Sequence, residues 1–150
     1  MDLVIDTTVL VDASGQGQQE YARSSYELLR FLADRSDWRL CFDRKGKIEN
    51  EYRNRISGQM YAQKWLKVCQ PRRFVPDPVR LPKGTRVQLE EAHFDWKDLP
   101  FVETAWSTAT RVIVTREFKS YTPDVIRILR RELRVRVVTA EQLLDSLRGT

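Results

Sequence analysis

Acidic side chains recur in this sequence at positions where regular elements are expected to begin or end. Asp6, Asp43 and Glu117 come at the ends of three short apolar runs that are typical of buried strands, and Asp98 opens a predicted helix. Because the carboxyl ends of parallel strands meet at one edge of a sheet, we expect these carboxylates to converge. Converging carboxylates repel one another, and Mg²⁺ or Mn²⁺ relieves that repulsion through hard oxygen ligands.

Glu51 is placed differently from the other acids. It shares the inward face of a predicted helix with Ile48 and Tyr52. A carboxylate on an apolar face needs a partner, because burial of an unpaired charge is unfavourable. Either a divalent cation or an arginine meets this need, and Arg55 stands one turn further along the helix.

Each acid also has an ordinary structural interpretation. Asp6 could end a strand, Glu117 could lie at the surface, and Asp98 could cap a helix whose first turn contains Pro100. Asp95 lies one turn before Asp98 and competes with it for the same role. The joint pattern favours a shared site over these separate explanations.

Strand-like and helix-like segments alternate along the chain, which predicts a parallel sheet covered by helices on both faces. We therefore predict one α/β domain over residues 1–150, with three layers (α/β/α) and a central, mainly parallel sheet of four to five strands. The expected strands are 3–5, 38–42, 112–114 and 135–138, with helices after Gly17, from Lys47, after Gly58, from Asp98, from Thr122 and from Thr139. The segment 71–82 contains four prolines and is expected to be a surface loop or a lid.

Composition limits the classes of function. A formal net charge of +5 and a pI near 9.4 favour a polyanionic partner. No apolar run is long enough to cross a bilayer, and Asp2, Asp6 and Asp12 interrupt the N-terminal apolar stretch, so we expect no membrane association and a cytoplasmic location. A thiolate metal site is unsupported because Cys41 and Cys69 form no ligand motif, and the single histidine, His93, offers weak support for a catalytic triad.

Four segments together resemble the PIN-domain nucleases over nearly the whole chain. Their order and spacing carry the resemblance, because no single segment is highly specific. They are residues 3–10, 48–52, 98–105 and 112–118. By position, Asp6, Glu51, Asp98 and Glu117 match the four acids of the family, in which the fourth is usually aspartate. Thr115 matches a supporting Ser or Thr, and Thr7 follows the first acid in the same motif.

The resemblance implies a PIN-like fold and hydrolysis of RNA phosphodiester bonds with Mg²⁺ or Mn²⁺. Asp6, Asp98 and Glu117 are then the expected metal residues. Asp6 and Asp98 are expected to bind the ion directly, whereas Glu51 and Glu117 are expected to ligate through water or to orient the nucleophile. Near the acids, Arg44, Lys45, Lys47 and Arg116 are expected to contact substrate phosphates.

Several alternatives remain within and beside the nuclease interpretation. The resemblance allows a toxin of a toxin–antitoxin pair, with an antitoxin or another regulatory protein as partner, and it allows a homodimer. A catalytically silent PIN-like module that binds RNA or protein is the main alternative, because Glu117 replaces the usual aspartate. A phosphotransferase of the haloacid dehalogenase type would need an aspartate at the position of Thr8, and we set it aside.

Overall fold

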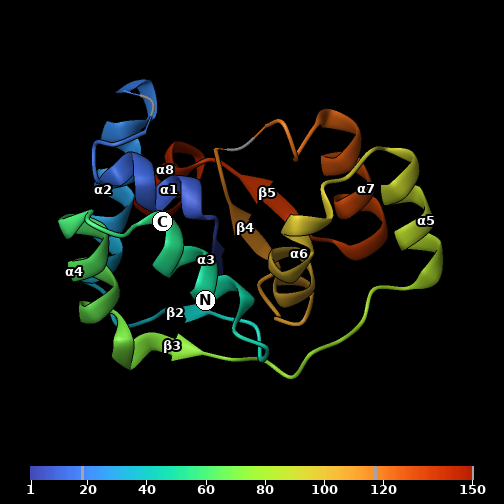
Figure 1. The fold of residues 1–150 in the computed structure, drawn as a ribbon, viewed down its shortest axis with the longest axis horizontal. Coiled ribbons are helices and arrows are strands. Elements are labelled where there is room, and N and C mark those ends of the chain that lie inside the picture. The colour runs from blue at the N-terminus through green and yellow to red at the C-terminus, as the bar shows by residue number, and fades with distance from the viewer. Residues whose placement is uncertain (18, 117, 150) are drawn as a thin grey trace.

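A five-stranded parallel sheet runs through the centre of the molecule (Figure 1). The computed structural model describes residues 1–17, 19–116 and 118–149. Within these residues the strand order is β3-β2-β1-β4-β5, and every neighbouring pair is parallel. The strands are β1 (Asp2–Ile5), β2 (Arg39–Cys41), β3 (Arg73–Phe74), β4 (Val112–Val114) and β5 (Arg136–Val138).

Helices cover the sheet in two groups, which lie to its left and right in Figure 1. In one group α2 packs against α1, α4 and α8, while in the other α6 packs on β1 and β4, and α7 packs on β5 and α5. Helix α3 contacts both α1 and α6 and so joins the groups. The helices are α1 (Thr7–Ala13), α2 (Gln19–Ala33), α3 (Lys47–Arg55), α4 (Met60–Val68), α5 (Lys83–Glu91), α6 (Leu99–Trp106), α7 (Pro123–Leu133) and α8 (Ala140–Arg148), with short 3-10 turns η1 (Gln70–Arg72) and η2 (Trp96–Asp98).

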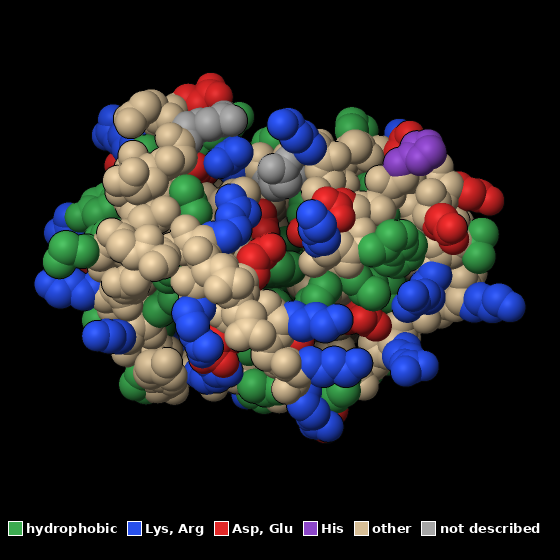
Figure 2. Space-filling view, in the orientation of Figure 1, with side chains coloured by type: hydrophobic (Ala, Val, Ile, Leu, Met, Phe, Trp, Pro, Cys, Tyr) green, Lys and Arg blue, Asp and Glu red, His purple; other side chains and the backbone are tan. Residues whose placement is uncertain are grey.

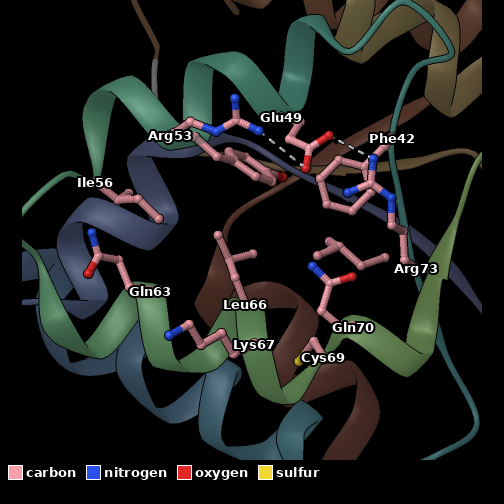
Figure 3. A pocket seen from close by; sticks show the side chains of 12 residues that line it. Phe42, Glu49, Arg53, Ile56, Gln63, Leu66, Lys67, Cys69, Gln70 and Arg73 are labelled. Atoms are coloured by element: carbon pink, nitrogen blue, oxygen red, sulfur yellow. Dashed lines mark hydrogen bonds and ion pairs between the residues drawn. The ribbon is translucent and has the colours of Figure 1, made fainter.

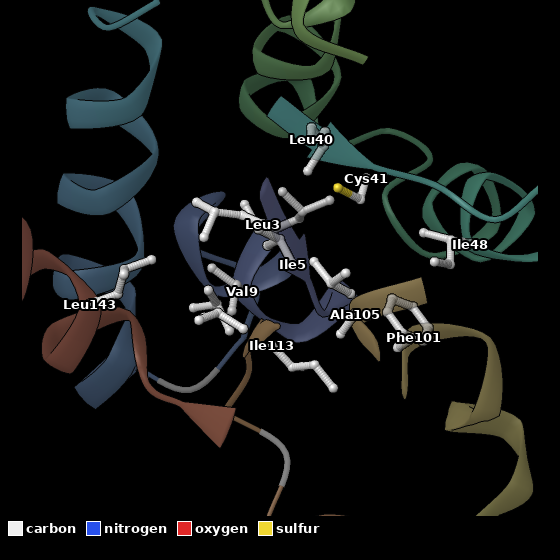
Figure 4. Packing of buried hydrophobic residues seen from close by; sticks show 14 of the residues in the cluster. Leu3, Ile5, Val9, Leu40, Cys41, Ile48, Phe101, Ala105, Ile113 and Leu143 are labelled. Carbon is white, nitrogen blue, oxygen red and sulfur yellow. The ribbon is translucent and has the colours of Figure 1, made fainter. Parts of the chain in front are cut away.

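The two central strands are buried on both faces. Residues of β1 and β4 pair in register, from Leu3 opposite Val112 to Ile5 opposite Val114. Their aliphatic side chains form the middle of the core, together with residues from the surrounding helices (Figure 4). Continuous β-branched and aliphatic runs suit such strands because water reaches neither face.

The chain changes direction across the sheet between β1 and β4. From β1 it moves outward through β2 and β3, and it then returns to β4 on the other side of β1. At the carboxyl end of this strand pair, the backbone N–H of Asp6 donates to the carbonyl of Val114 at 2.8 Å. Ligands of open parallel sheets bind in the crevice at such a switch point.

The three-layer α/β fold predicted from the sequence is confirmed, and the sheet has five strands in the described residues. The interpretation of segment 71–82 as loop was incomplete, because β3 lies at its start and pairs with β2. This strand has two residues and lies at the sheet edge, where neighbouring prolines are tolerated. Its first two residues belong to the 3-10 turn η1, and residues 75–82 contain no helix or strand.

Helices α1 and α5 were not predicted. Helix α1 has seven residues and nearly all of its side chains are buried, so it shows no amphipathic period. Helix α5 buries Thr85 and Leu89 among its nine residues, which leaves an equally weak pattern. By contrast, the helix predicted from Thr139 is present as α8, and a capping box of Thr139 and Gln142 begins it.

Two buried tryptophans join α2 to the rest of the core. The indole N–H of Trp38 donates to the carbonyl of Leu32, and that of Trp65 donates to the carbonyl of Leu29. The two rings stack with centroids 5.8 Å apart. Both are core residues, and their hydrogen bonds satisfy the polar edge of each ring. Across the described residues, none of the helices has the length and apolar character needed to cross a membrane.

Candidate active site

Asp6 follows β1 at the switch point and is 4% exposed. Its Oδ2 atom accepts hydrogen bonds from the hydroxyls of Thr8 at 2.7 Å and Thr115 at 2.8 Å. Burial raises the pKa of Asp6 because it disfavours the charged form, while the two hydroxyls partly oppose this shift. The contact between Thr115 and Asp6 joins the ends of β4 and β1, so the sheet itself fixes the direction of this carboxylate.

Glu51 approaches Asp6 from α3. Its Oε2 atom accepts a hydrogen bond from the hydroxyl of Thr7, the first residue of α1. Burial raises the pKa of Glu51, and the negative charge of Asp6 raises it further, whereas the charge of Arg55 lowers it. Helix α3 therefore brings Glu51 to the acid that ends β1, with Thr7 holding the carboxylate between the two helices.

Asp98 lies at the start of α6 and is 9% exposed. Although it occupies the N-cap position, its side chain makes no capping hydrogen bond and instead accepts one from Ser120. The capping role considered for Asp98 is therefore wrong. Asp95, the competing acid, is exposed, and its side chain accepts from the backbone N–H of Lys97, capping η2.

The carboxylates of Asp6, Glu51 and Asp98, which we call the acid site, interact electrostatically. The pKa of Asp98 is raised to about 7, first by burial and then by the charges of Asp6, Asp95 and Glu51. Among the ion pairs of the described residues, none joins an arginine or lysine to any member of the acid site. The position expected to supply a fourth acid, Glu117, lies outside the described residues.

The donor chemistry of the acid site fits a hard divalent cation. Carboxylate oxygens are the ligands that Mg²⁺ and Mn²⁺ prefer, and close negative charges without a basic partner favour a cation. The arrangement is not a closed metal cage, because the described residues contain no cluster of three His, Cys, Asp or Glu side chains spaced to hold an ion. Asp6, Glu51 and Asp98 thus fit a hard divalent cation in residue type and charge.

A groove of about 600 Å³ opens beside Glu51. Its walls come from the turn after β2, the proline-rich segment and the start of α6, and it is lined by Leu99, Pro100 and Trp96 along with basic residues. Figure 2 shows acidic side chains recessed in the centre of one face, with lysine and arginine side chains around them. We call the groove beside Glu51 the basic groove. Its basic residues are Arg44, Lys45, Lys47, Arg80 and Lys97.

The basic groove was only partly foreseen. Arg44, Lys45 and Lys47 were expected near the acids, and the groove places them beside Glu51. Arg80 and Lys97 were missed because they lie in segments without periodic pattern, more than thirty residues from the turn after β2. An ion pair of 2.7 Å between Arg44 and Asp77 connects that turn to the proline-rich segment.

Arg116 is held within the fold. Its Nε and Nη2 atoms each donate to the buried carboxylate of Asp12 at 3.0 Å, and its guanidinium lies over the ring of Tyr21. This bidentate pair joins the end of β4 to α1. The guanidinium of Arg116 therefore already has a protein partner. Its predicted contact with a substrate phosphate stays a prediction.

A smaller cavity of about 240 Å³ lies between α3, α4 and the β3 edge (Figure 3). No member of the acid site lines it. At its rim Glu49 forms ion pairs with Arg73 at 2.8 Å and Arg53 at 3.6 Å. Cys69 lies at its inner side, and burial raises the pKa of this thiol to about 11, so a reactive thiolate is not formed there at neutral pH.

Comparisons with known proteins support the fold. No family profile and no curated protein matches the sequence. A solved structure described as VapBC2 from Rickettsia felis, bound to a DNA fragment from its promoter, is similar over 93% of this chain and 98% of the matched chain. The TM-score is 0.52 and the sequence identity 16%, so the likeness concerns the fold. It supports the PIN-like architecture expected from the sequence.

Proposed function

We propose that this protein is a metal-dependent endoribonuclease. The observation that carries the proposal is the acid site at the switch point: three carboxylates, positioned by hydroxyl donors and without a basic partner in the described residues, beside the basic groove. The PIN-like fold supports it, since the sequence resemblance matches Asp6, Glu51 and Asp98 to acids of that family. Glu117 is retained as the proposed fourth acid.

The proposed roles follow from the positions of the side chains. Asp6 and Asp98 would hold Mg²⁺ or Mn²⁺ with Glu117, while Glu51 would act through a bound water. The chemistry that a bound ion would supply is polarisation of the phosphodiester and a lowered pKa of a bound water. Thr7, Thr8 and Thr115 keep the carboxylates of Glu51 and Asp6 oriented. The cations of the basic groove would bind backbone phosphates on the approach to Glu51.

The decisive test is cleavage of a panel of single-stranded and structured RNAs in Mg²⁺, Mn²⁺ or EDTA. Asp6→Asn and Asp98→Asn keep the shape of the side chains and should abolish metal-dependent cleavage. Asp124→Asn, which alters an exposed ion pair on α7, serves as a matched control and should cleave normally. Cleavage that persists in EDTA and in both acid-site variants would exclude this proposal.

A toxin of a toxin–antitoxin pair is the biological setting we propose, in the cytoplasm. The fold likeness to a structure described as VapBC2 favours this setting. It predicts that expression of the chain alone arrests growth and that Asp6→Asn does not. It also predicts a small protein partner that restores growth when expressed together with the wild-type chain.

A catalytically silent module that binds RNA or protein is the second candidate. It is favoured by one observation: the acid site lacks a ready-made metal cluster among the described residues. In that case RNA binding should be equal for the wild type and Asp6→Asn, with no cleavage in either metal.

A further inference from the structure

The hydroxyl of Tyr121 stands out among the buried polar groups. Tyr121 lies between β4 and α7, is 0% exposed, and packs its ring edge-on against Phe94. Its Oη atom is buried and, like Gln59 Oε1 and Arg72 Nε, has no hydrogen-bond partner among the described residues. The other fully buried tyrosine of the core, Tyr52, donates its hydroxyl to the carbonyl of Ile5. A buried hydroxyl without a partner is unfavourable by about 1–3 kcal/mol, so this group calls for an explanation.

Negative charge from the acid site surrounds this hydroxyl. Burial raises the pKa of Tyr121 well above its usual value, and the charges of Asp6, Asp98 and Glu51 raise it further. The phenol therefore keeps its proton at neutral pH and acts as a donor. Its neighbour in the chain, Ser120, already donates to Asp98, which places this segment against the acid site.

Packing alone does not account for the hydroxyl. A phenylalanine would keep the edge-on contact with Phe94 and would remove the unpaired oxygen. The nearby carboxylates already have hydroxyl donors, because Asp6 accepts from Thr8 and Thr115, and Asp98 accepts from Ser120. The missing partner of Tyr121 is thus an oxygen atom that enters with a ligand.

We propose that Tyr121 is a positioning residue whose hydroxyl donates a hydrogen bond to an oxygen ligand held among Asp6, Asp98 and Glu51. This inference rests on the proposed function, and it adds a neutral donor to a site otherwise composed of carboxylates. Two sources supply such an oxygen: a water bound to a divalent cation, and a non-bridging oxygen of an RNA phosphate.

The test is Tyr121→Phe, which deletes the hydroxyl and preserves the ring. Titration calorimetry with Mn²⁺ alone examines the water, and binding of a fluorescent, non-hydrolysable single-stranded RNA at saturating Mn²⁺ examines the phosphate oxygen. We expect the affinity to fall about five- to tenfold in whichever of the two measurements contains the oxygen that accepts from Tyr121, as for loss of one hydrogen bond to a charged ligand. The metal-free variant should melt at the same temperature as the wild type or higher, because it loses an unpaired buried group.

Tyr52→Phe is the matched control, since its hydroxyl has a backbone partner. It should lower the melting temperature and leave both affinities unchanged. Equal affinities of the wild type and Tyr121→Phe in both arms would overturn the inference and indicate a structural hydroxyl. If the wild type binds and cleaves RNA while Tyr121→Phe binds equally well, this inference alone fails. A wild type that binds neither Mn²⁺ nor RNA overturns the proposed function as well.

Discussion

Glu49 and Glu51 lie two residues apart on α3 and have opposite surroundings. Glu49 faces the β3 edge, where a hydrogen bond from Arg73 lowers its pKa, burial opposes this shift, and the charges of Arg73 and Arg53 lower the pKa further. Glu51 faces the acid site, where burial and the charge of Asp6 raise its pKa. Helix α3 thus carries one carboxylate that is paired with arginines and one carboxylate that lies close to other acids. The first arrangement stabilises the protein, and the second is the one that the proposed cation would complete.

The same contrast recurs on the neighbouring helix α1. Asp12 is fully buried and receives two hydrogen bonds from Arg116, whereas Asp6, just before the helix, is buried with neutral partners, the hydroxyls of Thr8 and Thr115 and the backbone N–H of Thr7. Burial by itself therefore does not distinguish a structural acid from a candidate catalytic one. The nature of the partner does, because an arginine satisfies a carboxylate permanently and a hydroxyl leaves its charge uncompensated.

The largest effect on stability is expected from Asp12→Asn, which breaks the ion pair between Asp12 and Arg116. It leaves the guanidinium of Arg116 partly buried against a neutral side chain, with a loss of about 3–5 kcal/mol in the free energy of unfolding. Urea unfolding measures the change. Asp124→Asn removes an exposed pair on α7 and should change stability by less than about 0.5 kcal/mol. Similar small losses in both variants would mean that the buried pair of Asp12 and Arg116 contributes no more to stability than an exposed pair.

Asp98→Asn should act in the opposite direction and stabilise the metal-free protein. The pKa of Asp98 is about 7 in the fold against an ordinary 3.8, so the folded state holds a proton that the unfolded chain releases. The free energy of unfolding should therefore fall as pH rises from about 4 to about 7, and level off above that. At about 1.4 kcal/mol per pKa unit, the gain from the substitution reaches at most about 4 kcal/mol above pH 7.

Urea unfolding in EDTA at several pH values checks this prediction. The difference between Asp98→Asn and the wild type should be small near pH 4 and should grow toward pH 7. A difference that does not depend on pH would mean that the charge of Asp98 does not oppose folding.

The two glutamates of α3 should separate in an RNA cleavage assay. Glu51→Gln is expected to lower the metal-dependent rate by roughly 100-fold or more, because it removes a carboxylate from the proposed ion site. Glu49→Gln should change the rate less than about twofold, since its partners lie at the smaller cavity. Rates measured at saturating and limiting Mn²⁺ show whether the loss comes from metal affinity. Equal rates for both variants would remove Glu51 from the site.

The smallest effect is expected for the stability of Glu49→Gln. Its side chain is 36% exposed, so solvent screens its pairs with Arg73 and Arg53. We expect a loss of less than about 1 kcal/mol at low salt, and a smaller loss in 1 M NaCl. Thermal unfolding at both salt concentrations measures it. A loss that is independent of salt would indicate a packing role at the smaller cavity instead.

The sequence predicted those parts of the structure that local pattern encodes. The apolar runs at β1 and β4 identified the central strands, and the positions of Asp6 and Asp98 relative to them indicated a common site. Helix α1 escaped prediction because burial around its whole surface removes the period that marks a helix. The strand β3 has two residues and depends on pairing with β2, which no local pattern records.

The residues of the candidate site were likewise predicted only in part. Thr115 was expected beside the acids, and its hydroxyl donates to Asp6. Ser120 and Tyr121 were missed, because their relation to Asp98 depends on how the segment between β4 and α7 folds back across the sheet edge. The groove residues Arg80 and Trp96 were missed for the same reason: three segments distant in sequence come together there.

The stacked pair of Trp38 and Trp65 also has an optical consequence. Both indoles are buried and hydrogen-bonded to carbonyls of α2, so their emission should shift to longer wavelength when the core opens to water. Trp96 lies at the basic groove and is 37% exposed, so a bound nucleobase would quench its fluorescence without disturbing the buried pair. Trp38 and Trp65 therefore report on unfolding and Trp96 reports on occupation of the groove without any label, while Trp106 at the end of α6 is a fourth indole that adds to the same spectrum.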